Sequence, residues 1–470
     1  MSEPTKDLIV ALDIGTSKVV AMIAEVLPNN GFNVIGIGHH PSRGMKRGMV
    51  VNIEETIQTI QYAIKEAELR AGFTVRSVCT GIAGSHIHSF NSSGMVAVKD
   101  TEITQNDIER VLDTARAVSI PADQQILHVL PQEYKVNDQD GIRTPIGMTG
   151  MRLEVKVHII TGSVSAAQNI VKCIRRCGLE VSDLRLQPLA SSTATLTQDE
   201  QDIGVALVDI GGGTTDIAVF VDGAIRHTAV IPIAGDQVTN DIAMALRTPT
   251  AEAEELKLRY GVAKQGMVPS ESVVEIPGVG DRVARRVKRQ SLAAVIEPRL
   301  EELFVLVQRN LQEAGFEHLI ASGVVLTGGT SLLPGVTELA EEVFMKPVRI
   351  AQPMYDGNLA DIVCNPRYST VVGLLMLFQP AVTALVMTIY IGVWALMTGV
   401  MEIVAAMRLR KEIQGEWLLI LGGLISVLFG IFVLMQPAAG MMAMLWVLAT
   451  YAVVFGVLMV ILAFKVRRAF

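Results

Sequence analysis

Leu12-Asp13-Ile14-Gly15-Thr16-Ser17-Lys18 stands near the start of this chain, and Val208-Asp209-Ile210-Gly211-Gly212-Gly213-Thr214-Thr215-Asp216 stands near its middle. An apolar run precedes each stretch and another follows it. Two apolar runs around a turn rich in glycine and hydroxyl side chains predict a β-hairpin. Glycine lets backbone N–H groups converge on an anion, because no Cβ blocks the approach. The aspartate before each turn can hold a hydrated divalent cation, so two facing hairpins would grip a nucleotide polyphosphate and its Mg²⁺.

The elements around the two turns repeat as well. Residues 7–50 are expected to form three strands, followed by a helix that Asn52 caps and Gly72 ends. Residues 203–246 follow the same plan, with a helix from about Gln237 to Leu246. Two β-meanders, each followed by helices, favour an α/β fold with two related lobes and a ligand between them.

Additional segments extend this plan. Residues 84–162 carry strand-like runs around one helix at Asn106–Val118, which indicates an inserted α+β subdomain. Residues 250–320 are expected to be mostly helical, interrupted by a basic patch around Arg285. A buried strand then runs into Gly328-Gly329-Thr330, where paired glycines would let backbone lie flat against a planar base or ribose.

Charge and cysteine content exclude some functions. The 470 residues carry a net charge of −7, while the residues from Ala381 onward hold six basic and three acidic side chains, so the preceding part carries −10. That acidic part argues against nucleic acid as the main partner. The four cysteines include no CxxC pair, and nothing at the N-terminus is typical of a signal peptide, so a reducing cytoplasm is expected.

The alternatives for the chemistry are few. Each aspartate could simply cap its turn and have no role in binding. Two matching motifs favour this interpretation less than a single motif would. The chain has no GxxxxGK[ST] motif, no nucleophile elbow and no HExxH, so a Walker P-loop and the common hydrolase and zinc motifs are excluded.

The order of a phosphate loop, a second phosphate loop and an adenosine loop resembles the actin, Hsp70 and sugar-kinase superfamily. Within it, the chain resembles the FtsA-like cell-division proteins over residues 5–377. The matching stretches are Pro41-Ser42-Arg43-Gly44-Met45, Ala63–Leu69, Val129–Tyr134, Val157–Thr161, Arg226–Pro232, Val295–Arg299 and Tyr368–Leu375.

This resemblance implies an actin-like fold with an ATP and Mg²⁺ site. The first phosphate loop would be Asp13, Gly15, Thr16, Ser17 and Lys18, and the second Asp209, Gly211, Gly212, Gly213, Thr214 and Thr215. Gly328, Gly329 and Thr330 would lie at the adenosine, with Glu254 and Lys257 at the ribose and adenine. Asp13 and Asp209 would hold Mg²⁺ through water. Gln187 would orient the attacking water, although FtsA-like proteins are often weak ATPases.

The resemblance also implies a domain plan and partners. The first lobe would comprise residues 1–83 and 163–200, the inserted subdomain 84–162, the second lobe 201–226 and 301–377, and the subdomain that docks the FtsZ tail 227–300. FtsA-like proteins link the FtsZ ring to the membrane, recruit later divisome proteins and self-associate into filaments. Such a protein would lie on the cytoplasmic face of the inner membrane at the division site.

Residues 378–470 depart from the family, whose members usually end in one amphipathic helix. Ala381–Met407, Trp417–Met435 and Met441–Phe464 are apolar and long enough to span a bilayer, which predicts about three transmembrane α-helices. Through this hydropathy and Leu409–Trp417, the segment resembles the last three helices of HdeD-like membrane proteins.

Topology leaves two explanations for this segment open. With three spans and the ATPase in the cytoplasm, both basic clusters of the segment would face outward, against the usual charge rule. Either the first apolar segment lies in the interface or re-enters, or the junction results from a gene fusion or an assembly artefact.

Two other functions stay open from the sequence. One is a small-molecule phosphotransferase of the same superfamily, which would need a polar substrate pocket deep in the cleft. The other is a membrane protein that an ATPase domain regulates.

Overall fold

A computed structural model of the chain describes residues 8–27, 31–99, 101–278, 283–377, 392–404 and 416–435. The chain divides into two units, Met1–Phe378 and Gln379–Phe470.

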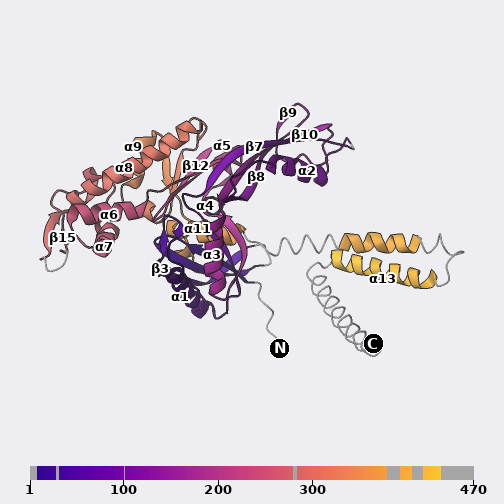
Figure 1. Cartoon of the computed structure of the whole chain (residues 1–470), viewed down its shortest axis with the longest axis horizontal. Coiled ribbons are helices and arrows are strands. Elements are labelled where there is room, and N and C mark those ends of the chain that lie inside the picture. The colour runs from indigo at the N-terminus through magenta and orange to yellow at the C-terminus, as the bar shows by residue number, and fades with distance from the viewer. Residues whose placement is uncertain are drawn as a thin grey trace. The chain divides into compact units, whose positions relative to one another are not determined.

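Two five-stranded mixed sheets form the two lobes of the first unit (Figure 1). The first sheet has the order β3-β2-β1-β6-β11, and the second has the order β14-β13-β12-β17-β18. Their strands are β1 (Leu8–Ile14), β2 (Lys18–Val26), β3 (Phe32–Pro41), β6 (Ser77–Ile82), β11 (Glu180–Leu186), β12 (Val205–Ile210), β13 (Thr215–Val221), β14 (Ala224–Ile231), β17 (Val324–Thr327) and β18 (Val348–Ile350).

The two sheets share one topology, which confirms the predicted duplication. In each sheet an antiparallel meander of three strands is extended by two parallel strands. The central strands β1 and β12 are almost wholly buried, because helices cover both faces, as continuous apolar runs predict. The fold is therefore an actin-like α/β fold with two related lobes.

Helices follow the meanders as expected. Helix α1 (Ile53–Ala71) begins where the Asn52 side chain accepts a hydrogen bond from the Glu55 N–H at 3.3 Å, and it ends at Gly72 with φ of 72°. Both predicted ends of this helix are confirmed. The other long helices of the lobes are α3 (Val164–Arg176), α6 (Gly235–Leu246), α7 (Thr250–Tyr260), α8 (Arg289–Glu313) and α9 (Val336–Phe344).

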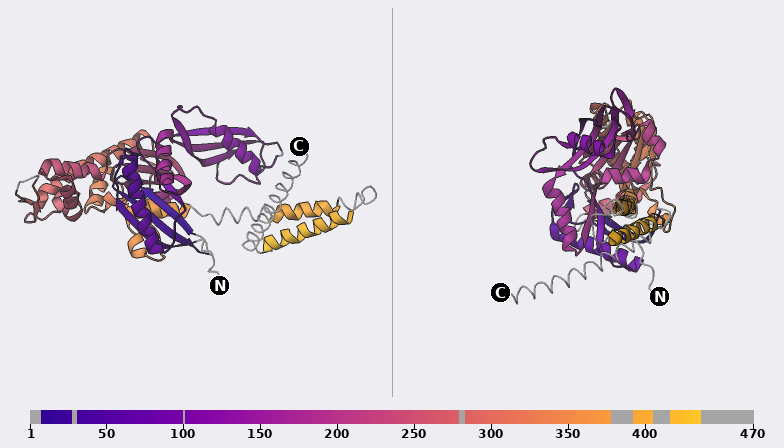
Figure 2. Two further views of the ribbon diagram at one scale, coloured as in Figure 1. Left: turned by 60° about the horizontal axis from the view of Figure 1, so that its bottom comes forward. Right: turned by 90° about the vertical axis from the view of Figure 1, so that its right-hand side faces the viewer.

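A separate small domain lies between β6 and α3. Its sheet has the order β7-β10-β8-β9, and α2 covers one face over an apolar core (Figure 2). The elements are β7 (His88–Ala97), α2 (Gln105–Arg116), β8 (Gln124–Val136), β9 (Gln139–Ile142) and β10 (Arg152–Ser163). An α+β insert was predicted here, and its strands are longer than the sequence indicated.

The expectation of mostly helical structure over residues 250–320 is wrong in part. Strands β15 (Val273–Ile276) and β16 (Arg285–Lys288) pair as an antiparallel hairpin. In β15 the side chains alternate, with Val274 and Ile276 buried and Val273 and Glu275 exposed. This period of two is the pattern expected of a strand. It was overlooked because the partner strand β16 is mostly basic and was taken as a break between helices. The shorter elements of the first unit are β4 (Met45–Lys46), β5 (Met49–Val50), α5 (Gln198–Ile203), α10 (Ala360–Val363), and the 3-10 turns Gln265–Met267, Gly329–Leu332 and Pro366–Tyr368.

Helices α4 (Gln187–Thr195) and α11 (Ser369–Leu377) join the lobes. Helix α11 follows the second sheet in the chain, yet Val371 and Leu374 pack in one core with strands of the first sheet. The two helices touch at Gly373, where an added Cβ would lie 1.7 Å from the Ala190 carbonyl oxygen. Only glycine permits this approach.

Residues 392–404 and α13 (Glu416–Met435) are the described helices of the second unit. They approach closely at paired glycines, since an added Cβ at Gly399 would lie 2.6 Å from the Gly423 carbonyl oxygen. Within the described ranges, no helix has both the length and the apolar character needed to cross a bilayer. The expected span Met441–Phe464 lies outside the described residues, so the predicted transmembrane helices are not confirmed.

Replacing Gly373 tests the contact between α4 and α11. We expect Gly373→Ala to lower the free energy of unfolding by about 2 kcal/mol or more, because the new methyl group overlaps backbone rather than a flexible side chain. Gly266→Ala is the matched control, since its Cβ would meet open space. Chemical denaturation measures both variants, and equal stabilities would contradict the close packing.

Candidate functional site

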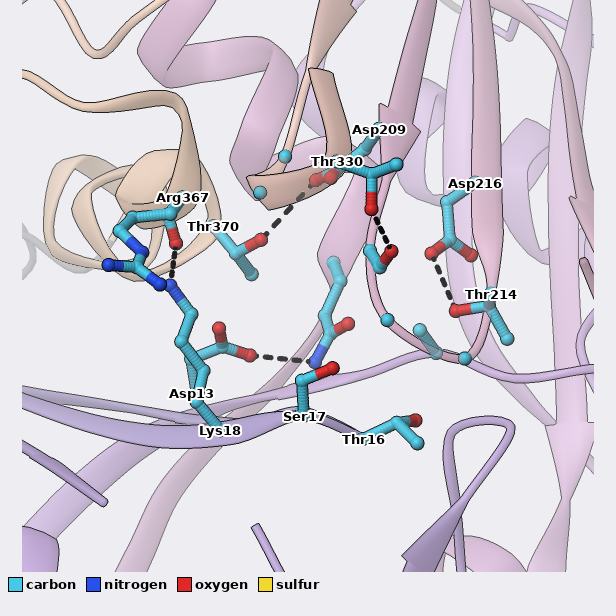
Figure 3. Close-up of a pocket in the computed structure, with 18 of the residues that line it drawn as sticks. Asp13, Thr16, Ser17, Lys18, Asp209, Thr214, Asp216, Thr330, Arg367 and Thr370 are labelled. Carbon is cyan, nitrogen blue, oxygen red and sulfur yellow. Dashed lines mark hydrogen bonds between the residues drawn. The ribbon is translucent and has the colours of Figure 1, made fainter. Parts of the chain in front are cut away.

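A cleft of about 310 Å³ lies between the two lobes of the first unit (Figure 3). It is lined by the two predicted turns, by α7 and by the turn that follows β17. All but one of the residues expected at the site line it: Asp13, Gly15, Thr16, Ser17, Lys18, Gln187, Asp209, Gly211, Gly212, Gly213, Thr214, Glu254, Lys257, Gly328, Gly329 and Thr330.

Thr215 is the exception, because it is fully buried and does not line the cleft. Its Oγ1 donates a hydrogen bond to the Ile233 carbonyl oxygen at 2.7 Å. Thr215 therefore fixes the segment between β14 and α6, and a role in ligand contact is not supported for it.

The two turns face each other at very short range. An added Cβ at Gly212 would lie 1.8 Å from Ser17 Oγ, and one at Gly213 would lie 2.6 Å from Thr16 Oγ1. The hairpins can approach this closely only because Gly212 and Gly213 have no side chains. Ser17 Oγ also donates to Asp236 Oδ1 at 3.3 Å. These glycines therefore allow the two lobes to pack closely, in addition to leaving room for a ligand.

Hydroxyl and amide side chains from the joining helices hold the two motif aspartates. Gln187 Nε2 donates to Asp13 Oδ1 at 3.0 Å, and Ser191 Oγ donates to Asp209 Oδ2 at 2.6 Å. Thr370 Oγ1 donates to the same oxygen of Asp209 at 3.4 Å. Sequence reasoning gave Ser191 and Thr370 no role, although Thr370 lies in a stretch that matches the family.

Burial raises the pKa of both motif aspartates. For Asp13, the charge of Asp209 adds to this effect and the charge of Lys18 opposes it. For Asp209, the hydrogen bond from Ser191 and the charge of Lys18 oppose it. Bringing two carboxylates into one cleft is costly without a cation between them.

Asp216 is a third carboxylate in the cleft, and sequence reasoning gave it no role. It lies directly across from Asp209 in the ladder between β12 and β13. Its Oδ2 accepts from Thr214 Oγ1 at 3.2 Å, whereas its buried Oδ1 has no hydrogen-bond partner among the described residues. Burial, followed by the charges of Asp209 and Asp13, raises the pKa of Asp216 to about 8. In the first hairpin Val20, an apolar residue, lies across from Asp13. This difference between the two copies is the sequence signal that could have pointed to Asp216.

Basic side chains lie beside the first turn. Lys18 Nζ donates to the Arg367 carbonyl oxygen and lies 4.5 Å from the centre of the Tyr368 ring. Burial lowers the pKa of Lys18, and the neighbouring charge of Arg367 acts in the same direction. Arg367 lines the cleft as well, and no motif indicated it. Both basic side chains line the cleft, and the negative charge of a bound polyphosphate would favour their charged forms.

The part of the cleft beside the second turn combines glycines with a buried lysine. Gly328 has φ of 86°, and an added Cβ would lie 2.4 Å from Asp209 Oδ1, so the turn after β17 requires glycine there. Lys257 is buried, and its Nζ lies 2.6 Å from Glu254 Oε2 and donates to Thr239 Oγ1 at 2.9 Å. Thr330 Oγ1 donates to the Gly211 carbonyl oxygen at 2.8 Å. The third motif is therefore tied to the second turn.

These residues fit a nucleotide polyphosphate with a divalent cation. Backbone-lined turns and two cations suit the phosphates, and an unpartnered carboxylate oxygen beside two further carboxylates suits a hydrated cation. In the described ranges, no group of three or more acidic, histidine or cysteine side chains is arranged to ligate a metal ion directly.

Profiles of known families match three parts of the chain. "Cell division protein FtsA" matches residues 206–373, and "SHS2 domain inserted in FTSA" matches residues 84–161. A short repeat of unknown function, DUF308, matches residues 368–435 and 421–470.

Curated relatives match over most of their length. The cell division protein FtsA of Pseudomonas aeruginosa is 59% identical over 369 residues, which are 78% of this chain and 88% of that protein. The protein of the same name from Escherichia coli K12 is 46% identical over 377 residues, covering 79% and 90%. Among solved structures, the PilM–PilN type IV pilus biogenesis complex matches 79% of this chain and 99% of its own, with a TM-score of 0.56 and 18% identity. At that identity the likeness concerns the fold alone.

The raised pKa of Asp216 makes stability depend on pH. The folded chain keeps this proton up to about pH 8, whereas an unfolded carboxyl loses it near 3.8, so the folded state binds more protons between these values. The free energy of unfolding of the unliganded wild type should therefore fall relative to Asp216→Asn by a few kcal/mol as the pH rises from about 5 to about 8.

Denaturation without nucleotide or metal, at both pH values, measures this difference. Asp356→Asn, at an exposed position, is the control and should track the wild type. A gap between D216N and wild type that is the same at both pH values would refute the buried, protonated carboxyl.

Proposed function

The chain belongs to the FtsA family of cell division proteins, and from this premise we propose that residues 8–377 bind ATP with Mg²⁺ in the cleft between the lobes. The observation that carries this proposal is the pair of glycine turns, each preceded by an aspartate, that meet at the cleft. Nucleotide binding at paired hairpins is what the family resemblance implies for these residues.

Each side of the cleft has its own role in this proposal. The turn at residues 15–18 and the turn at residues 211–214 hold the phosphates, while the turn at residues 328–330 and helix α7 hold the nucleoside. Asp13 and Asp209 hold Mg²⁺ through water, and the ion neutralises phosphate charge. The position of Asp216 supports adding it to this set. Gln187 orients the attacking water, and hydrolysis is slow.

Substitutions at Asp209 and Gln187 separate binding from turnover. We expect Asp209→Ala to abolish hydrolysis, because the hydrated metal loses a carboxylate that Ser191 holds in place. Gln187→Ala should lower the rate of hydrolysis about tenfold or more and change the affinity for ATP little, because the attacking water loses its partner while Asp13 loses one hydrogen bond and the phosphate turns keep their places.

Calorimetric binding of ATP and release of phosphate measure the two steps. If Q187A hydrolyses ATP as fast as the wild type while D209A does not, the assignment of Gln187 fails. Phosphorylation of an added sugar by the wild type would instead support the alternative function, a small-molecule phosphotransferase.

We further propose that the subdomain at residues 227–300 docks the C-terminal tail of FtsZ. A groove of about 530 Å³ supports this site. Met244 is 77% exposed there, and Arg299 pairs with Asp241 across the groove. An exposed apolar side chain in a groove suits a short peptide that offers apolar side chains. The lining residues are Asp241, Met244, Ala245, Val295, Pro298, Arg299 and Glu302.

A charge placed in this groove should prevent docking. Met244→Asp should weaken binding of a labelled FtsZ tail peptide about tenfold or more, since it puts a carboxylate on the apolar surface. Met95→Asp, at an exposed methionine of the inserted subdomain, is the matched control and should bind like the wild type. Fluorescence anisotropy measures both, and equal affinities would exclude this groove.

Other proposals concern the rest of the chain. Residues 378–470 are proposed to attach the protein to the cytoplasmic face of the inner membrane at the division site, which their apolar composition and the DUF308 match support. The domain boundaries given above, recruitment of later divisome proteins and filament formation remain predictions from the resemblance. A membrane protein regulated by its ATPase domain remains the alternative.

A further inference from the structure

The inserted subdomain contacts an edge strand of each lobe. Strand β11 is the outermost strand of the first sheet, and β14 is the outermost strand of the second. Strand β8 of the insert contacts both of them, while β7 and β10 contact β14. The insert therefore bridges the two lobes that form the cleft, and movement of one lobe against the other acts on its hydrogen bonds.

His128 makes the contact with the first lobe. Its imidazole is buried on β8, and Nε2 accepts a hydrogen bond from the Leu186 backbone N–H at 3.0 Å. Because the partner is a donor, Nε2 must carry the lone pair and Nδ1 the proton. Burial, with the charge of Arg185, lowers the pKa of His128 to about 4, against the opposing charge of Asp183. The ring is thus neutral near pH 7 and keeps its acceptor.

The Leu186 amide lies next to the proposed catalytic side chain. Leu186 ends β11, and Gln187 begins α4 as the following residue. The Gln187 side chain packs against Gly81, since an added Cβ at Gly81 would lie only 2.6 Å from Gln187 Cγ. Gln187 Nε2 donates to Asp13 Oδ1 at 3.0 Å. His128 therefore fixes the backbone one residue before Gln187, and Gly81 and Asp13 fix its side chain.

The second lobe holds β8 in place for this task. Gln132, also on β8, donates from Nε2 to the Ile225 carbonyl oxygen at 2.9 Å. On neighbouring strands, Ser89 Oγ donates to the Thr228 carbonyl oxygen at 2.9 Å, and His158 Nε2 lies 3.0 Å from Thr228 Oγ1. These bonds anchor the insert on β14, so the position of His128 depends on the second lobe.

We propose that His128 is a positioning residue for ATP hydrolysis, which sets Gln187 through the Leu186 amide and so makes turnover depend on how the inserted subdomain sits across the two lobes. This inference rests on the proposed ATPase function and deepens it. His128 touches neither nucleotide nor metal in this role, so its loss should affect the chemical step and leave ATP binding in place.

Two amide substitutions of His128 distinguish its hydrogen bond to the Leu186 amide from its packing in the core. The carbonyl oxygen of glutamine reaches the place of the imidazole Nε2, whereas that of asparagine reaches only the place of Nδ1. In the full chain, His128→Gln should keep kcat within about twofold. His128→Asn should lower kcat about tenfold with KM for ATP within about twofold, because a small displacement of a catalytic group is costly. His88→Asn, at an exposed histidine of β7, is the matched control and should behave like the wild type.

Coupling to Gln187 gives a second readout. Because both substitutions act on one step, His128→Asn in the Gln187→Ala background should cause little further loss of kcat. A third measurement needs no variant: hydrogen exchange at the Leu186 amide of the wild type should be slow with Mg·ATP bound. This measurement holds even if H128N proves unstable in thermal unfolding.

Three results would overturn the inference. These are equal kcat for H128N and H128Q, a rise in KM that accounts for the whole loss, or fast exchange of the Leu186 amide. A wild-type chain that binds ATP but does not hydrolyse it would also overturn the inference while leaving the binding proposal intact. A chain that binds no ATP would overturn the proposed function itself.

Discussion

The close contact of two backbone turns is the constraint on which the cleft depends. Gly212 and Gly213 lie where any side chain would overlap Thr16 and Ser17. A methyl group at either glycine would require Thr16, Ser17 or the turns themselves to shift. The same contact brings three carboxyl groups together, since Asp13, Asp209 and Asp216 all line one small volume. Burying these groups together without a counterion disfavours their charged forms.

Hydrogen bonds from the joining helices make this arrangement tolerable. Gln187 and Ser191 on α4 and Thr370 on α11 each donate to one of the motif aspartates. Because α4 follows the first sheet and α11 follows the second, the carboxylates are held by the segments that join the lobes. The positions of the two aspartates therefore depend on how α4 packs on α11, and so does the relative position of the lobes. Gly373 allows the two helices to cross closely.

Local pattern predicted the parts of the site that lie in one stretch of sequence. Each motif turn, the cap at Asn52 and the repeated meander depend on neighbouring residues, and the structure contains them. Ser191 and Thr370 could not be found in this way, because their role arises only when distant helices meet. The hairpin of β15 and β16 was missed for a different reason, since its four-residue strands are short and one is mostly basic. Thr215 was assigned to the ligand by its place in a motif, whereas strand alternation turns its side chain toward Ile233.

The packing of α11 has a consequence for synthesis of the chain. Val371 and Leu374 complete an apolar core whose other wall includes Ile9 and Val20, more than 300 residues earlier. The N-terminal lobe therefore cannot finish folding while it emerges from the ribosome, and its sheet must wait with one face uncovered until residue 375 has been translated. Nascent chains of this protein are for that reason candidates for chaperone binding until almost the whole first unit has been made.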